Sequence, residues 1–389
     1  MPVESTLHGS ALLYRLLESY PPDRLMVIED GSAPSQPGRR VRGVPYRTLA
    51  SGGSRLRTTR LHAWWSLWQS LRSASWAGEV PGLLGGFSPE AVLTVAHGHR
   101  WVTAAEFARR RRLPLHLIVH DDWPRVATLP PPFANRVNLQ FGSIYRAAAS
   151  RLCVSPWMEA DYRQRYGPHG QVLYPSRSRE VPVYAAPPDR LRRSDSGLTI
   201  AFAGSLNVPD YFRILGAVAQ VLQTLGGRVL VFGSTDAKQA ALGGLSMANV
   251  QFRGRLSSRE LMERLREEVD VLLVPMSFAP GDAGPVQLSF PSKLTDYTAV
   301  GLPLLITGPA HSSAVRWARE HPGVAEVVDV ADFDSLAAAV GRLAGDTDYR
   351  VRLAARALEV GARMFSHETA WNLLTEVLTG PSSRPEMRH

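Results

Sequence analysis

The sequence predicts an α/β protein built from two tandem domains. Short apolar runs alternate with amphipathic segments of helix length, a pattern typical of parallel sheets covered by helices. A chain of 389 residues and 42.7 kDa also exceeds one ordinary hydrophobic core. A stretch rich in Pro, Arg and Ser, without any period, then indicates a linker. We expect domains at 1–176 and 198–365, a linker at 177–197, a C-terminal helix at 366–380 and a disordered tail at 381–389.

In the first half, apolar runs predict strands and amphipathic segments predict helices. The expected strands are 25–28, 91–96, 115–119 and 152–155. The expected helices are 11–18, 61–73, 102–110, 136–149 and 158–166. An α/β domain ordinarily opens with a strand, whereas the first element expected here is a helix. Either that strand is missing or the true start lies upstream.

The second half repeats the alternation more regularly. The expected strands are 198–203, 228–232, 250–252, 271–275 and 302–307. One helix places Phe212, Leu215, Val218, Leu222 and Leu225 on a single face. A capping box at Ser257 and Glu260 opens another, and Pro291 opens a helix over 291–300. The last helix has an apolar repeat, so it packs against another part of the chain, and we expect it to cross back to the first domain. The repeat consists of Ala370, Leu373, Leu374, Val377 and Leu378.

Composition limits the classes of protein. A formal charge of +9 and a pI near 10 attract anions, and a nucleic acid, an anionic leaflet or a phosphorylated small molecule would each satisfy this balance. No apolar run approaches the ~20 residues that span a bilayer. There is no secretory signal pattern, and the single cysteine, Cys153, suits a reducing compartment. We therefore expect a cytoplasmic protein, from a bacterium with G+C-rich coding bias.

The stretch from Ser289 to Pro309, "SFPSKLTDYTAVGLPLLITGP", holds one of only two lysines in the chain, Lys238 and Lys293. Pro291 suits a first helical turn, where the N–H groups of Ser292 and its neighbours would form an anion site beyond a strand. Lys293 adds a mobile positive charge suited to a phosphate, and Asp296 could accept hydrogen bonds from ribose hydroxyls. The alternative is a solvated pair of charges three residues apart on a surface helix.

The order and spacing of several motifs resemble one enzyme family. The second half contains "FAGSL", "VLVFGS", "NVQFRGRLSSREL", "DVLLVPMSF" and "FPSKLTDYTAVGLPLLITG". The first half contains "HGSALLYRLLE", "VLTVAHGH", "LHLIVHDDWP", "RLCVSPWMEADYRQRYG" and "VLYPS". These resemble the retaining, family 4-like glycosyltransferases of the GT-B type, in which two Rossmann-like domains face a central cleft. The resemblance implies a transferase that uses a nucleotide sugar.

The resemblance also implies roles for individual residues. Asp296 falls at the second glutamate of the family's E-x7-E motif, which binds the donor ribose. The donor diphosphate would be held by Lys293 with Pro291 and Ser292, near the turn at Gly204 and Ser205. The base would be walled by Gly233 and by the loop Arg253, Gly254 and Arg255. In the first domain, His120 would face the transferred sugar, with Gly9 and His97 on the acceptor side.

Two departures from the family pattern affect the donor site. Leu288 stands where the first motif glutamate belongs, so contacts to the sugar hydroxyls would come from elsewhere, with Asp282 as one candidate. Ser205 stands where the family commonly has a basic residue, so phosphate neutralisation would depend on Lys293 and on Arg213 or Arg255. Both departures motivate one alternative, a catalytically silent binding or scaffold protein of the same fold. A nucleotide-sugar epimerase is a second.

We therefore expect a metal-independent retaining transferase with no cofactor, which uses a nucleotide-diphosphate sugar as co-substrate. The acceptor is open among a glycan, a lipid-linked glycan and a small molecule, and no nucleic acid is expected. The helix carrying Trp64, Trp65 and Trp68 is expected to pack in the core, and the alternative is contact with a membrane surface or a lipid-linked acceptor. Asp121 and Asp122 could be turn or cap residues or acceptor ligands, whereas Asp332 and Asp346 are expected to cap helices.

Overall fold

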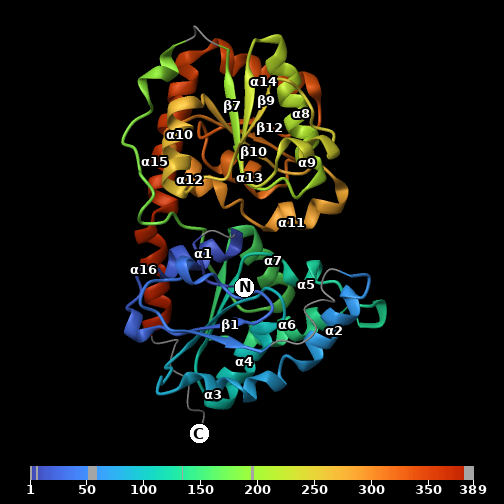
Figure 1. Ribbon diagram of the computed structural model, residues 1–389, viewed down its shortest axis with the longest axis vertical. Helices are drawn as coiled ribbons and strands as arrows, with labels where there is room; N and C mark the ends of the chain where they lie inside the picture. Colours follow the sequence, from blue (N-terminus) through green and yellow to red (C-terminus); the bar gives the residue numbers. More distant parts are fainter. Residues whose placement is uncertain (1, 6–7, 51–58, 134, 194–196, 381–389) are drawn as a thin grey trace. The chain divides into compact units, whose positions relative to one another are not determined.

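The structure is a computed structural model that describes residues 2–5, 8–50, 59–133, 135–193 and 197–380. The chain divides into two compact units (Figure 1). Unit 1 combines residues 1–176 with 367–389, and unit 2 is residues 177–366. The tail expected at 381–389 lies outside the described residues. Both units are α/β, as the alternating pattern predicts. No described helix is both long and apolar enough to cross a membrane.

Unit 2 is built on a six-stranded parallel sheet in the order β12-β11-β10-β7-β8-β9. Its strands are β7 (Thr199–Ala203), β8 (Arg228–Phe232), β9 (Val250–Gly254), β10 (Val271–Pro275), β11 (Leu304–Thr307) and β12 (Glu326–Val328). The first strand, β7, lies between β8 and β10, so the order of strands reverses direction there. In open α/β sheets, ligands bind at this switch point, beyond the carboxyl ends of the strands.

Helices cover both faces of the unit 2 sheet, with α8, α9 and α14 on one side and α10, α12 and α15 on the other (Figure 1). Their bounds are α8 (Pro209–Thr224), α9 (Ala237–Leu242), α10 (Ser258–Glu268), α11 (Ala283–Leu288), α12 (Lys293–Val300), α13 (Ser313–Glu320), α14 (Phe333–Gly345) and α15 (Thr347–Phe365). Because both faces are covered, the central strands are buried along their whole length, as in β7 and β10. The predicted face of α8 packs here through Leu215, Val218 and Leu222.

Unit 1 contains two separate parallel sheets, one of β1-β2 and one in the order β3-β4-β5-β6. Its strands are β1 (Val27–Asp30), β2 (Tyr46–Leu49), β3 (Val92–Val95), β4 (Leu115–Val119), β5 (Ser150–Cys153) and β6 (Gln171–Val172). Its helices are α1 (His8–Leu17), α2 (His62–Arg72), α3 (Val80–Leu84), α4 (Arg100–Arg111), α5 (Trp123–Val126), α6 (Arg136–Ala147), α7 (Pro156–Tyr166) and α16 (His367–Thr379).

The C-terminal helix α16 belongs to unit 1, where it lies beside α1 (Figure 1). Ala370, Leu374 and Val377 join the hydrophobic cluster that contains Leu13 and Leu16 of α1. The return of the final helix to the first domain, predicted from its apolar repeat, is therefore observed.

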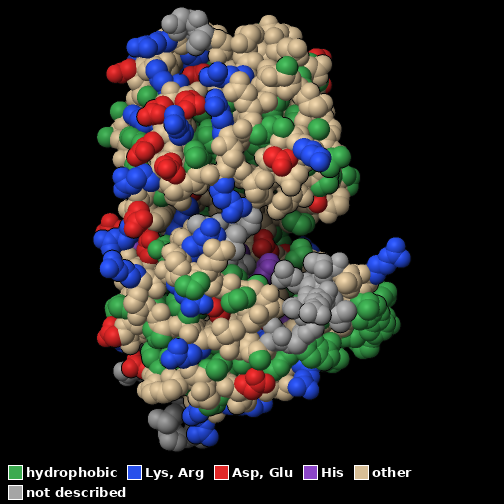
Figure 2. All heavy atoms as spheres, in the orientation of Figure 1, with side chains coloured by type: hydrophobic (Ala, Val, Ile, Leu, Met, Phe, Trp, Pro, Cys, Tyr) green, Lys and Arg blue, Asp and Glu red, His purple; other side chains and the backbone are tan. Residues whose placement is uncertain are grey.

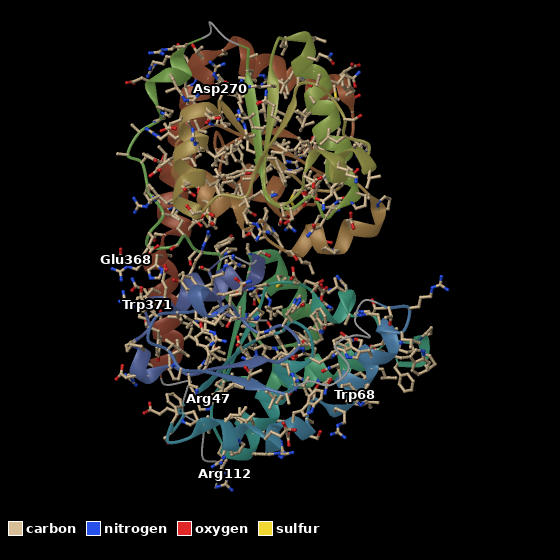
Figure 3. The ribbon with its side chains drawn as sticks, viewed as in Figure 1. Arg47, Trp68, Arg112, Asp270, Glu368 and Trp371 are labelled. Atoms are coloured by element: carbon tan, nitrogen blue, oxygen red, sulfur yellow. The ribbon has the colours of Figure 1, made fainter. Side chains whose placement is uncertain are left out.

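Residues 177–193, which make up most of the expected linker, instead pack on unit 2. Leu191 is fully buried, and the Tyr184 N–H donates to the Ala299 carbonyl over 3.3 Å. The Arg190 guanidinium pairs at 2.8 Å with Asp270, which is labelled in Figure 3. The hydrogen bond and the ion pair come from a stretch that contains no strand or α-helix among its described residues, and such contacts leave no periodic pattern in a sequence. The interpretation as a linker is wrong for this reason.

Candidate functional site

Three glycines follow the carboxyl ends of neighbouring strands in unit 2. Gly204 follows β7, Gly233 follows β8, and Gly254 ends β9, all with positive φ. The Gly204 N–H donates to the Phe232 carbonyl (2.8 Å), and the Gly233 N–H donates to the Gly254 carbonyl (2.9 Å). A Cβ on Gly233 would lie 2.2 Å from the Gly204 carbonyl oxygen, so only glycine fits. The result is an edge of bare backbone that a ligand can approach closely.

Helix α12 is fixed to this edge through Tyr297. Its hydroxyl accepts from the Ala203 N–H (2.6 Å) and donates to the Ala203 carbonyl (3.3 Å) at the end of β7. A tight turn through Pro291 and Ser292 leads into α12, which begins at Lys293, two residues later than predicted. The helix start therefore lies over the Gly204 turn, where a Cβ on Gly204 would be 3.6 Å from the Lys293 Nζ atom.

The Lys293 ammonium group lies against aromatic rings. Its Nζ atom is 4.0 Å from the ring centroid of Phe202 and 5.5 Å from that of Tyr211. Among the ion pairs and hydrogen bonds of the described residues, none involves this group. Burial lowers the pKa of Lys293 to about 7. The site thus holds, at the switch point, an amine that can carry a positive charge and that no described carboxylate neutralises, which suits an anion-binding site.

Asp296 lies one turn further along α12, near the buried guanidinium of Arg177. Arg177 donates from Nε to the Thr295 carbonyl (2.8 Å) and from a terminal nitrogen to the Thr298 hydroxyl (3.0 Å). Burial lowers the pKa of Arg177 to about 10, and the negative charge of Asp296 acts in the opposite direction. Asp296 is therefore more than a solvated partner of Lys293. Arg177 was missed because it stands in a stretch without a pattern.

The other basic candidates differ from Lys293. Arg253 pairs with Glu268 at 3.6 Å, and Arg213 pairs with Asp210 at 2.7 Å, so both have carboxylate partners. Arg255 is exposed on the loop after β9, and Ser205 follows the Gly204 turn. Lys293 is therefore a better candidate than Arg253 or Arg213 for binding a phosphate.

Leu288 and Asp282 lie at opposite ends of α11. Leu288 is 1% exposed, so it offers nothing to a sugar hydroxyl. Asp282 precedes α11 and adds, after burial, to the causes that raise the pKa of Tyr211 to about 12. Asp282 therefore lies near the Tyr211 ring that Lys293 approaches, in the neighbourhood where it was predicted to help.

The candidate site of unit 1 lies at the carboxyl ends of β3 and β4, which are followed by His97 and His120. The His97 ring centroid is 4.8 Å from that of Trp123, and the His99 centroid is 6.0 Å from it. Four buried nitrogens here have no hydrogen-bond partner among the described residues: Nδ1 of His97, His99 and His120, and Nε1 of Trp123. Unpaired buried polar atoms are rare and suggest a ligand. Trp123 and His99 were not predicted for this site.

These histidines are neutral at physiological pH. Burial lowers the pKa of His120 and of His99 to about 4. Burial also lowers the pKa of His97, against the charge of Asp121, whose carboxylate is 3.8 Å away. Neutral imidazoles can donate or accept one hydrogen bond at each nitrogen, which suits hydroxyl groups better than a phosphate. Gly9 lies in the first turn of α1 rather than in a loop.

Several other candidates have structural roles. Asp122 is buried and accepts from the Tyr162 hydroxyl (2.9 Å) and from Arg165 (3.0 Å), so it supports the fold. Asp332 and Asp346 cap α14 and α15, which confirms the capping prediction. Cys153 is a buried thiol, and burial raises its pKa to about 12.

Solved structures of known proteins share this architecture. HepE from Anabaena, in complex with UDP, matches with a TM-score of 0.66 at 14% identity, over 97% of this chain and 98% of that chain. WaaG, a glycosyltransferase involved in lipopolysaccharide biosynthesis, matches with a TM-score of 0.62 at 14% identity, over 95% and 96%. A trehalose-6-phosphate synthase matches with a TM-score of 0.61 at 13% identity, over 97% and 98%. The chain has the GT-B fold.

No family model matches the sequence, and no curated protein matches it either. At these identities the likeness establishes the GT-B fold and leaves function to the residues of the site. The GT-B neighbours span nearly the whole chain, so both units take part in the match.

Proposed function

We propose that this protein is a retaining glycosyltransferase that moves a sugar from a nucleoside diphosphate to an acceptor. The acceptor would be a glycan, a lipid-linked glycan or a small molecule. The observation that carries the proposal is Lys293, whose ammonium group lies over the bare backbone of Gly204 and has no carboxylate partner in the part of the chain that the structure describes. UDP or a UDP-sugar is bound in the structures of HepE, and the study of the trehalose-6-phosphate synthase concerns transfer with retention.

The chemistry needs positive charge at the leaving group. When the bond from the anomeric carbon to the diphosphate breaks, negative charge develops on the phosphate oxygen that leaves. Lys293 and the N–H groups that start α12 would stabilise this charge without a metal. The acceptor hydroxyl would attack the face that the diphosphate leaves, and a phosphate oxygen would take its proton. His120, neutral and with Nδ1 unpaired, would orient the sugar by a hydrogen bond.

Isothermal titration of UDP, GDP and ADP tests the donor site. We expect one of them to bind and Lys293→Ala to weaken that binding roughly ten- to hundredfold, because a charged hydrogen bond contributes about 1.5–3 kcal/mol. Lys238→Ala is the control, since Lys238 is the other lysine and is exposed on α9. Equal affinity of Lys293→Ala and wild type would show that the diphosphate binds elsewhere.

The rival functions differ in their products. A silent binding protein would bind the nucleotide but release no diphosphate from the sugar nucleotide. An epimerase would return an altered sugar nucleotide and needs acid and base groups around the sugar. Leu288, buried where the motif has a glutamate, supplies no acid or base group, which favours the silent binding protein over the epimerase. Chromatography of the nucleotide products distinguishes the three outcomes.

We also propose that unit 1 contacts a membrane through one face of α2, which would keep a cytoplasmic enzyme at the inner leaflet. Leu61, Trp64, Trp68 and Leu71 are 53%, 59%, 40% and 53% exposed, so the core-packing prediction is wrong for Trp64 and Trp68. Their spacing puts them on one side of the helix, beside Arg60 and Arg72. Figure 2 shows hydrophobic side chains gathered in this region, and Figure 3 labels Trp68. An exposed face of this composition suits an anionic bilayer.

Co-sedimentation with anionic phosphatidylglycerol vesicles tests this contact. Trp64→Ser should weaken the affinity for vesicles roughly ten- to hundredfold, because a buried large apolar side chain contributes about 1.5–3 kcal/mol. Leu242→Ser is the matched control, since Leu242 is an 86% exposed apolar residue in unit 2. If both variants bind vesicles as wild type does, α2 is not the contact.

A further inference from the structure

Among the described residues of unit 1, the parallel strands leave a gap between β1 and β3. β1 pairs with β2, and β3 pairs with β4, but no described ladder joins β1 to β3. A doubly wound sheet has the order 3-2-1-4-5-6, with its first strand between the second and the fourth. Unit 2 has this order in full. In unit 1 the corresponding order is β2, β1, a gap, and then β3, β4, β5 and β6. The gap falls where a doubly wound sheet has the strand that comes first in the chain.

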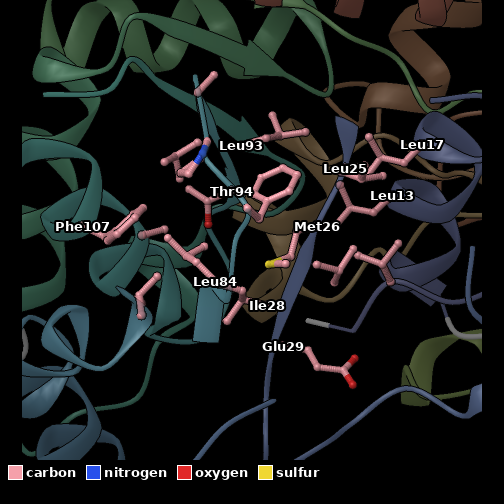
Figure 4. Close-up of a pocket in the computed structure, with 18 of the residues that line it drawn as sticks. Leu13, Leu17, Leu25, Met26, Ile28, Glu29, Leu84, Leu93, Thr94 and Phe107 are labelled. Carbon is pink, nitrogen blue, oxygen red and sulfur yellow. The ribbon is translucent and has the colours of Figure 1, made fainter. Parts of the chain in front are cut away.

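A cavity of about 900 Å³ occupies that position (Figure 4). One wall is β1 with residues 25–30, and the opposite wall is β3 with residues 91–95. Neither wall is covered as a central strand should be, because Ile28 of β1 and Leu93 of β3 are only half-buried. Strands at the centre of a parallel sheet are ordinarily buried on both sides, as β4 is throughout.

Apolar side chains line the cavity on both faces of the missing sheet position. Leu13 and Leu17 of α1 line one face, in the cluster that includes Val27 and Val95. Leu84 and Phe107 line the other face, in the cluster that includes Ile28. Because successive residues of a strand point to opposite faces, these clusters lie on the two sides of the sheet. Such an environment fits a run of consecutive apolar residues in an extended strand.

We propose that one further parallel strand of about five apolar residues fills this gap, and that the same polypeptide supplies it from upstream of Met1. The unfilled edges of β1 and β3 would provide its hydrogen bonds, which buried backbone requires. Helix α1 precedes β1 in the chain, and in a right-handed crossover a strand precedes such a helix. Val3 is buried in the cavity wall, so the chain already reaches the gap.

The added strand has a consequence for the candidate site of unit 1. A parallel strand between β1 and β3 would end at the same edge as β3 and β4, which are followed by His97 and His120. The loop from that strand to α1 would therefore lie beside the unpaired histidine nitrogens. The inference depends on the sheet alone and stands whether or not the protein transfers a sugar.

The intact mass and N-terminal peptide of the protein, isolated from the organism that encodes it, provide the first test. We expect a mass above 42.7 kDa and an upstream segment containing a run of four to six apolar residues. A mature N-terminus at Met1 or Pro2 overturns the proposal. An apolar small molecule that co-purifies in the cavity, detected by native mass spectrometry, overturns it as well.

The second test compares two chains that carry that upstream segment and differ at one residue, the central apolar residue of the run or proline in its place. Hydrogen–deuterium exchange should be slower in β1 and β3 of the unaltered chain, and its unfolding temperature should be higher. Proline removes a ladder hydrogen bond and should abolish both effects. Equal exchange in β1 and β3 of the two chains contradicts a strand in the gap.

Discussion

Lys293 rests on the faces of two aromatic rings rather than beside a carboxylate. A cation over an aromatic face is attracted by about 0.5–2 kcal/mol, less than the cost of removing an ammonium group from water. The aromatic rings therefore do not fully offset the loss of hydration, and burial lowers the pKa of Lys293 to about 7. A bound diphosphate would provide the missing partner. The burial that makes Lys293 available to an anion also makes its ammonium form less stable in the free protein.

Nucleotide binding should depend on pH because of this lysine. Below pH 7 the ammonium form already prevails in the free protein, whereas above it a bound diphosphate must first restore the proton. The dissociation constant should rise up to tenfold per pH unit between pH 7 and 9. Titration calorimetry in two buffers of different ionisation enthalpy measures both the affinity and the proton uptake.

Lys293→Arg is the control for the pH profile. A guanidinium group keeps its charge throughout this range, so the affinity of the variant should change little from pH 7 to 9. A flat profile for the wild type would mean that Lys293 is already charged in the free protein.

Individual residues of the donor site could be predicted only where a motif marks them. Lys293, Gly204 and Gly233 stand in recognisable turns, and the structure places them together. Phe202 is an apolar strand residue like its neighbours, and nothing local shows that its ring supports an ammonium group. Arg177 contacts residues more than a hundred positions away, so its partners are visible only in the fold.

At the scale of elements, α12 is fixed on two sides. Tyr297 bonds the end of β7, and Arg177 bonds the backbone of α12. Gly361 of α15 lies on the same side as Arg177, where a Cβ would be 2.2 Å from the Thr298 hydroxyl oxygen. The position of Lys293 therefore depends on contacts that other elements make with α12.

Gly361→Ala should displace α12. The added methyl group has no space, so we expect a loss of about 1–3 kcal/mol in the free energy of unfolding and weaker nucleotide binding. Gly341→Ala is the matched control, because Gly341 also lies in a helix, α14, but a Cβ there has no atom within 4 Å. Chemical denaturation and titration of both variants measure the two effects. Unchanged affinity in Gly361→Ala would show that α12 accommodates the methyl group without moving.

The elements themselves could be predicted where their pattern is long or strongly apolar. The predicted strands 228–232 and 271–275 match β8 and β10 at both ends. The two-residue strand β6 and the short helices α3, α5, α9 and α11 were missed, because four to six residues are too few to show a helical period. β2 was missed as well, since Tyr46–Leu49 contains two exposed polar residues, Arg47 and Thr48.

At the scale of the whole molecule, the two ends of the chain share one core. Leu374 of α16 is fully buried in the cluster that contains Leu13 and Leu16 of α1. A segment that follows unit 2 in the sequence therefore completes unit 1. The apolar repeat predicted that this helix packs, but its partner α1 is some 350 residues away and could be identified only from the structure.

Leu374→Ala should destabilise unit 1. Truncation of a fully buried leucine costs about 2–5 kcal/mol, and exchange of amide hydrogens should accelerate in α1 and β1 while β7 and β10 stay protected. Asn372→Ala, at an exposed position of the same helix, is the control. Equal acceleration in both units would mean that they unfold as one.

The chain passes from unit 1 to unit 2 after Ser176 and returns after Ser366, and the Arg177 N–H donates to the Phe365 carbonyl at 3.0 Å. Unit 2 is thus an insertion whose two ends meet. In the order of synthesis, the whole of unit 2 precedes α16, so unit 1 still lacks part of its core after the last residue of unit 2 has been added. The domain that begins the chain therefore completes its core last, in contrast to the usual order in which an N-terminal domain is complete first.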